Sequence, residues 1–273
     1  MSNAPRAFAD LHEFAAYLRD QGEIREITER VSPRLEITEI ADRVVKAGGP
    51  ALLFRNVEGS EIPVLINTFG SEKRMAWAIS ANRFEDVAER VREMTDLRPP
   101  SGMMESIQGL GKLKDLLSFA PRRARRGPCQ DIVLEGDDVD LGRIPVLTTW
   151  PKDAGPFITL PLVFTRDPAT SIRNVGMYRL QVYDKRTTGM HWHIHKDGSK
   201  HYMGLAPGAR LPVAVALGGP PALIYAATAP LPPGLDEVMF AGFLAREGVE
   251  MTPCKTIDLE VPARAEIVLE GYV

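Results

Sequence analysis

Cysteine is scarce in this chain of 273 residues, which contains only Cys129 and Cys254. Two thiols so far apart in the sequence are too few for a disulfide framework, and they are typical of a reducing compartment. Long apolar runs are missing as well, since none approaches the roughly 20 residues that a membrane-spanning helix needs. The start of the chain, residues 1–14, has no basic region followed by an apolar one, so we expect no secretory signal. These absences predict a cytoplasmic protein with no membrane span.

An excess of charge of either sign is also absent. The chain has 33 Lys and Arg against 36 Asp and Glu, which gives a formal net charge of -3. A molecule of this charge has no general attraction to nucleic acid or to an anionic membrane, so we expect neither as a partner. Hydrophobic residues make up 44% of the chain, and its length is enough for one large domain or two modest ones with a buried core.

The N-terminal part of the sequence, from residue 8 to about 120, is dominated by helical patterns. Apolar residues recur at helical spacing in 8–22, 35–49 and 83–94, and the first two of these stretches end at glycine. Short strand-like runs occupy 51–57 and 63–70. We therefore expect an N-terminal α/β domain over residues 1–125.

A cluster of four arginines separates the helical patterns of the N-terminal part from the short β segments that follow. Arg122, Arg123, Arg125 and Arg126 are followed directly by Gly127 and Pro128. The cluster could bind an anionic ligand or phosphate, or it could be a solvated connection between domains. We favour the connection, because charge runs that end in turn residues are typical of exposed linkers.

Short β segments separated by turn residues fill most of the sequence beyond the arginines, and they predict a barrel or a sandwich over residues 126–273. One helix is expected among them, at about 234–248. The expected strands lie in 131–136, 157–167, 174–184, 211–219, 222–229, 256–262 and 265–271.

Four of the five histidines fall within residues 189–202. Residues 174–196 resemble a β-hairpin whose returning strand carries His191, His193 and His195. Alternate residues on a strand point to the same side, so these imidazoles would share one face, while Trp192 and Ile194 would point into a core. Such a row could bind a metal or face solvent, because this spacing has no single meaning.

The motifs of the C-terminal half, read together, resemble the UbiD family of decarboxylases, which use prenylated FMN. The resemblance rests on "NVGMYRLQVYDKRTTGMHWHIHKDG", on "WPKDAGPFITLPLVFTRDP" before it, and on "VALGGPPALIYAATAPLPPGLDEVMFAGFL" and "CKTIDLEVPARAEIVLEGYV" after it. It implies an α+β protein in which the N-terminal α/β domain leads into a split β-barrel related to flavin reductases. It also implies reversible, non-oxidative decarboxylation of an aromatic or α,β-unsaturated acid.

The resemblance assigns a metal site to Asn174, His195 and Glu237, which would hold a divalent cation against the cofactor phosphate. An amide oxygen, an imidazole and a carboxylate suit Mn²⁺ or Mg²⁺ better than a thiolate-loving metal, and K⁺ is a further candidate. Without the resemblance, Asn174 would be a turn residue at the start of a strand, and Glu237 a carboxylate favoured by a helix N-terminus.

The resemblance also makes Arg179 the residue that positions the substrate carboxylate, because a planar guanidinium can bind a carboxylate through two hydrogen bonds. The alternative is a surface arginine on a barrel strand. His201 is expected to be structural. The remaining cofactor contacts implied by the family are Met177, Tyr178, His191, Trp192, His193, Lys196 and Asp197, with Arg179 among them.

The family's proton-donating acid pair lies beyond the strand that ends here at Val273, as does a C-terminal domain. Two hypotheses follow: the chain is part of a longer homo-oligomeric enzyme, or it is a non-catalytic module that binds flavin phosphate and metal. A redox function is weaker, since no G-x-G-x-x-G fingerprint follows any strand. The expected partners are a small aromatic or unsaturated acid and a flavin prenyltransferase that supplies the cofactor.

Overall fold

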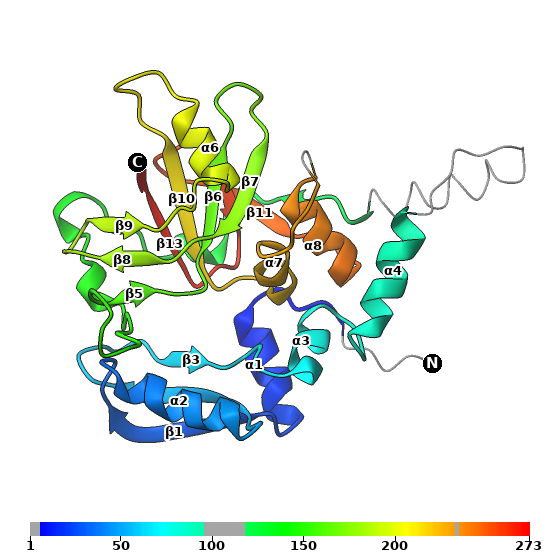
Figure 1. Cartoon of the computed structure of the whole chain (residues 1–273), viewed down its shortest axis with the longest axis vertical. Helices are drawn as coiled ribbons and strands as arrows, with labels where there is room; N and C mark the ends of the chain where they lie inside the picture. The colour runs from blue at the N-terminus through cyan, green and yellow to red at the C-terminus, as the bar shows by residue number, and fades with distance from the viewer. Residues whose placement is uncertain (1–5, 96–117, 233–234) are drawn as a thin grey trace, which may run out of the picture.

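The computed structural model describes residues 6–95, 118–232 and 235–273 as a mixed α+β protein (Figure 1). In the N-terminal part, β1 (Ile24–Val31) and β2 (Ala51–Val57) are parallel, and β3 (Val64–Ile66) is antiparallel to β2. Helix α2 (Glu36–Lys46) connects β1 to β2, because parallel neighbours require a crossover. The expected mixture of helices and sheets is thereby confirmed.

Helix α1 (Leu11–Asp20) begins at an aspartate cap and joins the N-terminal part to the C-terminal part. The Asp10 carboxylate accepts a hydrogen bond from the Glu13 N–H at 2.8 Å, which satisfies a free donor of the first turn. Its second oxygen accepts from Arg264 Nε at 2.8 Å. Helices α3 (Glu72–Ala78) and α4 (Glu85–Thr95) follow. No helix among the described residues is long and apolar enough to cross a membrane.

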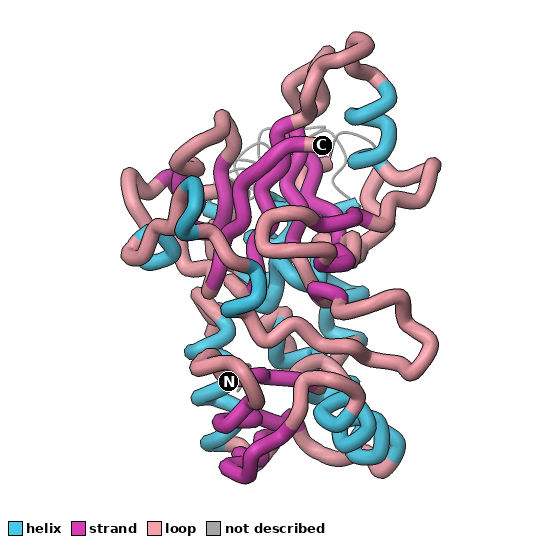
Figure 2. The backbone as a smooth tube through the Cα atoms, turned by 90° about the vertical axis from the view of Figure 1, so that its left-hand side faces the viewer, coloured by secondary structure: helices cyan, strands magenta, loops and turns pink. Residues whose placement is uncertain are grey.

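An antiparallel sheet of four strands forms the centre of the C-terminal part, in the order β13-β10-β6-β7. Figure 2 shows strands gathered at one end of the molecule, with the smaller β1-β2-β3 group at the other. The four strands are β6 (Leu162–Arg166), β7 (Arg173–Met177), β10 (Pro212–Leu217) and β13 (Ile267–Tyr272).

Two smaller sheets complete this part. One has the order β5-β8-β9 and the other β12-β11-β4, and both are open within the described residues. Their strands are β5 (Phe157–Ile158), β8 (Leu180–Val182), β9 (Thr188–Met190), β4 (Arg122–Arg123), β11 (Glu250–Pro253) and β12 (Glu260–Pro262).

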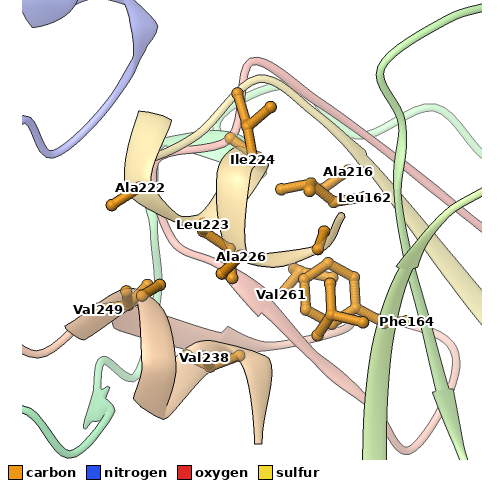
Figure 3. Packing of buried hydrophobic residues seen from close by; sticks show 14 of the residues in the cluster. Leu162, Phe164, Ala216, Ala222, Leu223, Ile224, Ala226, Val238, Val249 and Val261 are labelled. Carbon is orange, nitrogen blue, oxygen red and sulfur yellow. The ribbon is translucent and has the colours of Figure 1, made fainter. Parts of the chain in front are cut away.

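Both faces of the four-stranded sheet are buried, and the alternation of side chains along β10 shows how. Ala214 and Ala216 belong to the largest core, whereas Val213 and Val215 belong to a second cluster that contains Tyr178. Small alanines on one face allow helices α7 (Pro221–Ala226) and α8 (Glu237–Ala245) to pack closely against the sheet (Figure 3). The bulkier valines face the β5-β8-β9 side. A sheet covered on both faces gives the nearly continuous apolar run of β10.

Two of the expected strands are wrong. Residues 222–229 were expected to be a strand, but α7 occupies Pro221–Ala226. A short apolar run cannot by itself distinguish a strand from a buried helix, and Pro221 in the first turn favours the helix. Residues 131–136 form no strand, and Ile132, Val133 and Leu134 are exposed.

The other expected elements are close to those observed, with some omissions. The helix expected at 234–248 is α8, and Gly234 lies outside the described residues. Helix α6 (Asp197–Met203) was not expected, and neither were α3, β1 and β11.

The arginine cluster is more ordered than a free connection. Arg122 and Arg123 form β4, which pairs in parallel with Glu250 and Met251 of β11. The Arg122 guanidinium lies 2.7 Å from the Glu247 carboxylate, and that of Arg123 lies 3.2 Å from Glu260. Both side chains are exposed, so these pairs contribute little to stability. The solvated alternative describes the side chains well, while the backbone belongs to a sheet.

Gly127 provides a test of how closely this segment packs. A Cβ at Gly127 would lie 2.2 Å from the Ala263 carbonyl oxygen, a backbone atom that cannot move aside easily. Gly127→Ala should therefore lower the free energy of unfolding by about 1–3 kcal/mol, measured by urea denaturation. The matched control is Gly271→Ala, where a new Cβ meets nothing within 4 Å. Equal effects of the two substitutions would contradict the close approach at Gly127.

Candidate functional site

Asn174 and Glu237 come together where β7 meets the start of α8. Asn174 is buried on β7, where it pairs with Thr165 of β6. Glu237 is the first residue of α8, and its carboxylate accepts a hydrogen bond from the Val175 N–H at 3.0 Å. The preceding Asp236 caps the helix by accepting from the Val238 N–H at 2.7 Å. The cap and the strand contact thus fix the Glu237 carboxylate beside the Asn174 backbone.

The Glu237 carboxylate lies in an environment that disfavours its negative charge. Burial raises the pKa of this group, and the nearby carboxylates of Asp236 and Asp197 raise it further. The hydrogen bond from the Val175 N–H acts in the opposite direction. A half-buried anion among other acids is stabilised most effectively by a cation.

Two buried donors around Tyr178 have no hydrogen-bond partner in the part of the chain that the structure describes. They are the side-chain amide Nδ2 of Asn174 and the indole Nε1 of Trp192. A buried polar group without a partner costs free energy, and in native proteins such groups commonly receive a partner from a ligand or from water. These two donors could bind an anionic group such as phosphate.

Tyr178 links the two donors. Its ring packs against Trp192 edge-on, with the ring centroids 6.3 Å apart. Burial raises the pKa of the Tyr178 hydroxyl, while the Gly198 N–H lowers it. The Asn174 amide is near enough to lower this pKa as well, but its geometry is not that of a hydrogen bond. Gly176 leaves room for this ring, since a Cβ there would lie 2.2 Å from the tyrosine oxygen. The sequence N-V-G-M-Y therefore brings the Asn174 amide close to the Tyr178 phenol, and Gly176 leaves the room that the phenol ring occupies.

The histidine run does not form the strand that the sequence suggested. Strand β9 ends at Met190, and residues 191–196 are a loop and turn that lead into α6. His191, His193 and His195 are all exposed, and so is Ile194, whose exposed fraction is 65%. The prediction that Ile194 points into a core is therefore wrong. Side chains do not alternate between two faces here, because the chain leaves the sheet directly after Met190, which is paired with Leu180 at the end of β9.

The turn nevertheless keeps its histidines together. The rings of His193 and His195 have centroids 5.1 Å apart, and the His195 N–H donates to His193 Nδ1 at 3.4 Å. The Lys196 N–H donates to the His193 carbonyl at 3.0 Å, and Lys196 directly precedes α6. Asp197, the first residue of that helix, pairs with Lys200. No group of three or more His, Cys, Asp or Glu suited to a metal occurs within residues 6–95, 118–232 and 235–273.

Arg179 lies between β7 and β8, directly after Tyr178. Its guanidinium carbon is 4.5 Å from the centre of the Phe157 ring, a cation–π contact. The residue is exposed, and its backbone carbonyl accepts a hydrogen bond from the His191 N–H at 3.0 Å. Met177, by contrast, packs against the largest core. The structure thus leaves the Arg179 guanidinium accessible while its backbone is held by the start of the histidine loop.

Phe157 and Asp153 were not singled out from the sequence. Both lie in the quoted motif "WPKDAGPF", and the Asp-x-Gly order is a recognisable turn signal. The contact between Phe157 and Arg179 depends on how β5 and β8 are aligned, which sequence spacing alone does not reveal.

His201 is buried, as expected for a structural residue. Its Nδ1 lies 2.9 Å from the Thr165 hydroxyl, directly across the strand pair from Asn174. Burial lowers the pKa of the imidazole, which keeps it neutral over a wider range of pH. This pair lies beneath the candidate site and supports the β6–β7 pairing there.

Two sequence models of one family match the chain. The model of the 3-octaprenyl-4-hydroxybenzoate carboxy-lyase Rift-related domain, called UbiD, matches residues 122–273. The model of the N-terminal domain of the same carboxy-lyase matches residues 15–94. Together they cover most of the chain.

Similar proteins are longer than this chain. A protein of Archaeoglobus fulgidus is 51% identical over 269 residues, which are 98% of this chain and 55% of that protein. A protein of Aquifex aeolicus is 47% identical over 269 residues, with 97% of this chain and 55% of that protein covered. The chain therefore spans about half the length of the curated relatives that it matches.

Solved structures of UbiD-class enzymes have the same fold. The enzyme HmfF from Pelotomaculum thermopropionicum, in complex with FMN, is 29% identical with a TM-score of 0.80, over 96% of this chain and 54% of that chain. An evolved dimeric form of it, in complex with prenylated FMN, is 27% identical with a TM-score of 0.79, over 97% and 57%. Vanillic acid decarboxylase from Sedimentibacter hydroxybenzoicus, in closed form, is 25% identical with a TM-score of 0.83, over 98% and 55%.

The buried His201 predicts how stability depends on pH. Its pKa is lower in the folded state than the ordinary value of about 6.5, so the unfolded chain takes up the proton first. Its contribution to stability is complete above pH 6.5 and is lost as the pH falls toward the folded-state pKa, with a slope of at most about 1.4 kcal/mol per pH unit. His201→Gln should remove this component from urea unfolding curves measured between pH 5 and 8. The exposed His191→Gln is the control, and an identical slope in wild type and His201→Gln would contradict the prediction.

Proposed function

Because this chain belongs to the UbiD family of carboxy-lyases, we propose that it holds prenylated FMN and the carboxylate of an acid substrate in a decarboxylase. The observation that carries the proposal is the junction of β7 and α8. There a half-buried acid contacts the strand of Asn174, and the side chains of Asn174 and Trp192 have buried donors without partners among the described residues. This family membership favours an enzyme over a non-catalytic binding module.

The three residues predicted as ligands have the donor atoms that a divalent cation prefers. Asn174 offers an amide oxygen, Glu237 a carboxylate, and His195 an imidazole in the turn before α6. Hard oxygen ligands with one nitrogen suit Mn²⁺ or Mg²⁺. The acids Asp197 and Asp236 add negative potential that favours the cation, as their effect on the pKa of Glu237 indicates. We propose these three residues as the ligands, with K⁺ as a further candidate ion.

The same junction fits a phosphate group only when a cation is present. Asn174 Nδ2 and Trp192 Nε1 could donate to phosphate oxygens, which would satisfy both donors. The carboxylates of Glu237 and Asp197 would repel the phosphate, so phosphate binding would be favourable only with a divalent ion held by the proposed ligands. The flavin would then extend along Met177, Tyr178 and the loop of His191, Trp192 and His193, with Lys196 and Asp197 at the start of α6.

Arg179 is proposed to bind the substrate carboxylate. Its guanidinium is accessible and always charged, and its planar fork can bind a carboxylate with two hydrogen bonds. Decarboxylation breaks the bond between the carboxyl carbon and the substrate carbon, which then takes up a proton. When bound, prenylated FMN supplies the electron sink that this bond cleavage requires. The role of Arg179 is to orient the carboxylate and hold it until carbon dioxide forms.

Several finer features of the family are proposals for this chain. We propose that residues 1–125 and 126–273 are two domains, and that the β13-β10-β6-β7 and β5-β8-β9 sheets together form a split β-barrel of the flavin-reductase kind. The substrate would be an aromatic or α,β-unsaturated acid. The complete enzyme would form a homo-oligomer and receive its cofactor from a flavin prenyltransferase.

The metal assignment can be tested without catalysis. Glu237→Ala should remove bound Mn²⁺ and weaken FMN binding at least tenfold, because one ligand and the bridge to the phosphate are lost together. Riboflavin, which lacks the phosphate, should bind the variant and the wild type equally. The measurements are metal content by mass spectrometry and flavin affinity by fluorescence quenching.

Glu247→Ala is the matched control. Glu247 is an exposed carboxylate just beyond the C-terminal end of α8, and it pairs with Arg122. It should leave both readouts unchanged. Unchanged Mn²⁺ content and FMN affinity in Glu237→Ala would remove Glu237 from the ligand set.

The role of Arg179 is tested in the complete enzyme loaded with cofactor. Arg179→Ala should lower carbon dioxide release from aromatic and acrylic acids by at least about 100-fold, because the carboxylate is no longer oriented. Bound flavin should remain, as measured by absorbance. Arg186→Ala, which removes an exposed arginine from the β8–β9 turn, is the control. Loss of flavin together with activity would make Arg179 a cofactor anchor instead.

A further inference from the structure

We propose that Phe157 and Asp153 are positioning residues for Arg179, and that the loop of residues 148–156 holds its guanidinium in the orientation that a substrate carboxylate needs. This inference rests on the proposed function of Arg179. It assigns a role in the reaction to a loop that has no metal ligand and no flavin contact in the proposal above.

The alignment of β5 and β8 places Phe157 next to Arg179. In this antiparallel pair Phe157 is opposite Gln181, and Ile158 is opposite Leu180. Side chains alternate between faces, so Phe157, Gln181 and Arg179 share one face, and Phe157 and Arg179 are diagonal neighbours. Aromatic and long side chains can reach each other across such a diagonal. The observed distance of 4.5 Å from the guanidinium carbon to the ring centre agrees with this.

Phe157 is itself held firmly. Its side chain is buried, and its N–H donates to the Leu147 carbonyl at 2.9 Å, which closes the base of the 148–156 loop. Gln181 fastens the far part of the loop by donating from Nε2 to the Ala154 carbonyl at 3.1 Å. Because two strands and the closed loop fix the Phe157 ring, the Arg179 guanidinium packs against a surface of fixed orientation.

Asp153 organises the loop on the side near Arg179. One carboxylate oxygen, Oδ2, accepts from the Thr149 hydroxyl at 2.6 Å and from the Trp150 N–H at 3.1 Å. These bonds lower the pKa of Asp153, with the Thr149 bond as the largest cause, and the positive charge of Arg179 lowers it further. The Asp153 carboxylate thus keeps the loop in shape, and its charge attracts the Arg179 guanidinium at a longer range than that of an ion pair.

The loop is also joined to the N-terminal part of the chain. The Leu35 N–H donates to the Thr148 carbonyl at 2.9 Å, and the Thr148 N–H donates to the Pro33 carbonyl at 3.2 Å. Leu35 adopts a positive φ of 68°, which is strained for a residue other than glycine and is retained where surrounding structure fixes it. The N-terminal part therefore contributes to the placement of Arg179 through this pair of bonds.

The test compares three substitutions in the full chain. Phe157→Leu removes the ring, and Phe157→Tyr keeps it. Asp153→Asn keeps an oxygen acceptor for Thr149 and Trp150 but removes the charge beside Arg179. Asp184→Asn is the matched control, because Asp184 caps the β8–β9 turn in the same way, through the N–H groups of Arg186 and Thr187.

The first readout is the NMR signal of the Arg179 Nε–H group, assigned with Arg179→Lys. In the wild type we expect an upfield proton shift from the Phe157 ring. Phe157→Leu should lose this shift, and Phe157→Tyr should keep it. Asp153→Asn should speed the exchange of the Nε proton with water about 2-fold, because the loop loses a negative charge that attracts the guanidinium. Asp184→Asn should change neither property.

The second readout is decarboxylation by the complete enzyme loaded with cofactor. Phe157→Leu should lower kcat about tenfold with less than a twofold change in flavin affinity, because small errors in orientation reduce the rate of the chemical step. An Arg179 signal that stays the same in Phe157→Leu and in Asp153→Asn would overturn the positioning inference. If Phe157→Leu does not fold, Asp153→Asn at its half-buried loop position still decides it. A changed signal with unchanged decarboxylation in Arg179→Ala would instead overturn the proposed function and leave the positioning intact.

Discussion

The burial of both faces of the β13-β10-β6-β7 sheet is the constraint on which the candidate site depends. One face packs on α7 and α8, and the other packs on the β5-β8-β9 sheet. A sheet that is covered twice has no free face, so a polar side chain on it must be satisfied inside the protein, whereas one that lies beyond the strand ends can reach solvent. Asn174 is the buried case, on β7 opposite Thr165, and Arg179 is the exposed one, between β7 and β8. The core thus decides where the chemistry can be.

The passage from β7 to β8 is also where the chain moves from one core to the other. Met177 packs against the large core on the helix side, while the next residue, Tyr178, belongs to the second cluster. Gly176 and Gly198 leave space for the tyrosine ring at this crossing. The crossing separates the candidate cation site near Asn174 from the accessible guanidinium of Arg179. One short segment can therefore serve a phosphate at one end and a carboxylate at the other.

The sequence predicts the helices and the candidate site residues best where they depend only on the neighbouring sequence. The helices at α1, α2 and α8 follow from apolar spacing and caps, and Asn174 and Glu237 were named from motifs that the structure brings together. The errors have a common physical origin in tertiary context. Residues 222–229 could pack as a strand or a helix, and only the neighbouring sheet decides between them. The histidine run alternates like a strand, but no partner strand extends beyond Met190. The contact of Phe157 with Arg179 depends on strand alignment, which spacing along the chain cannot supply.

The polar groups of the junction destabilise the folded protein when no ligand is bound. Burying Glu237 near Asp197 and Asp236 is unfavourable, as the raised pKa shows, and the Asn174 and Trp192 donors add a further cost. Such costs persist only where the surrounding structure outweighs them, and here the cap at Asp236 and the core around β7 hold the groups in place. A cation would favour the charged form of the acid, and an anion bound to that cation would satisfy the donors. These unfavourable contributions would cancel best if both ions bound together, and the binding of one ion would then strengthen that of the other.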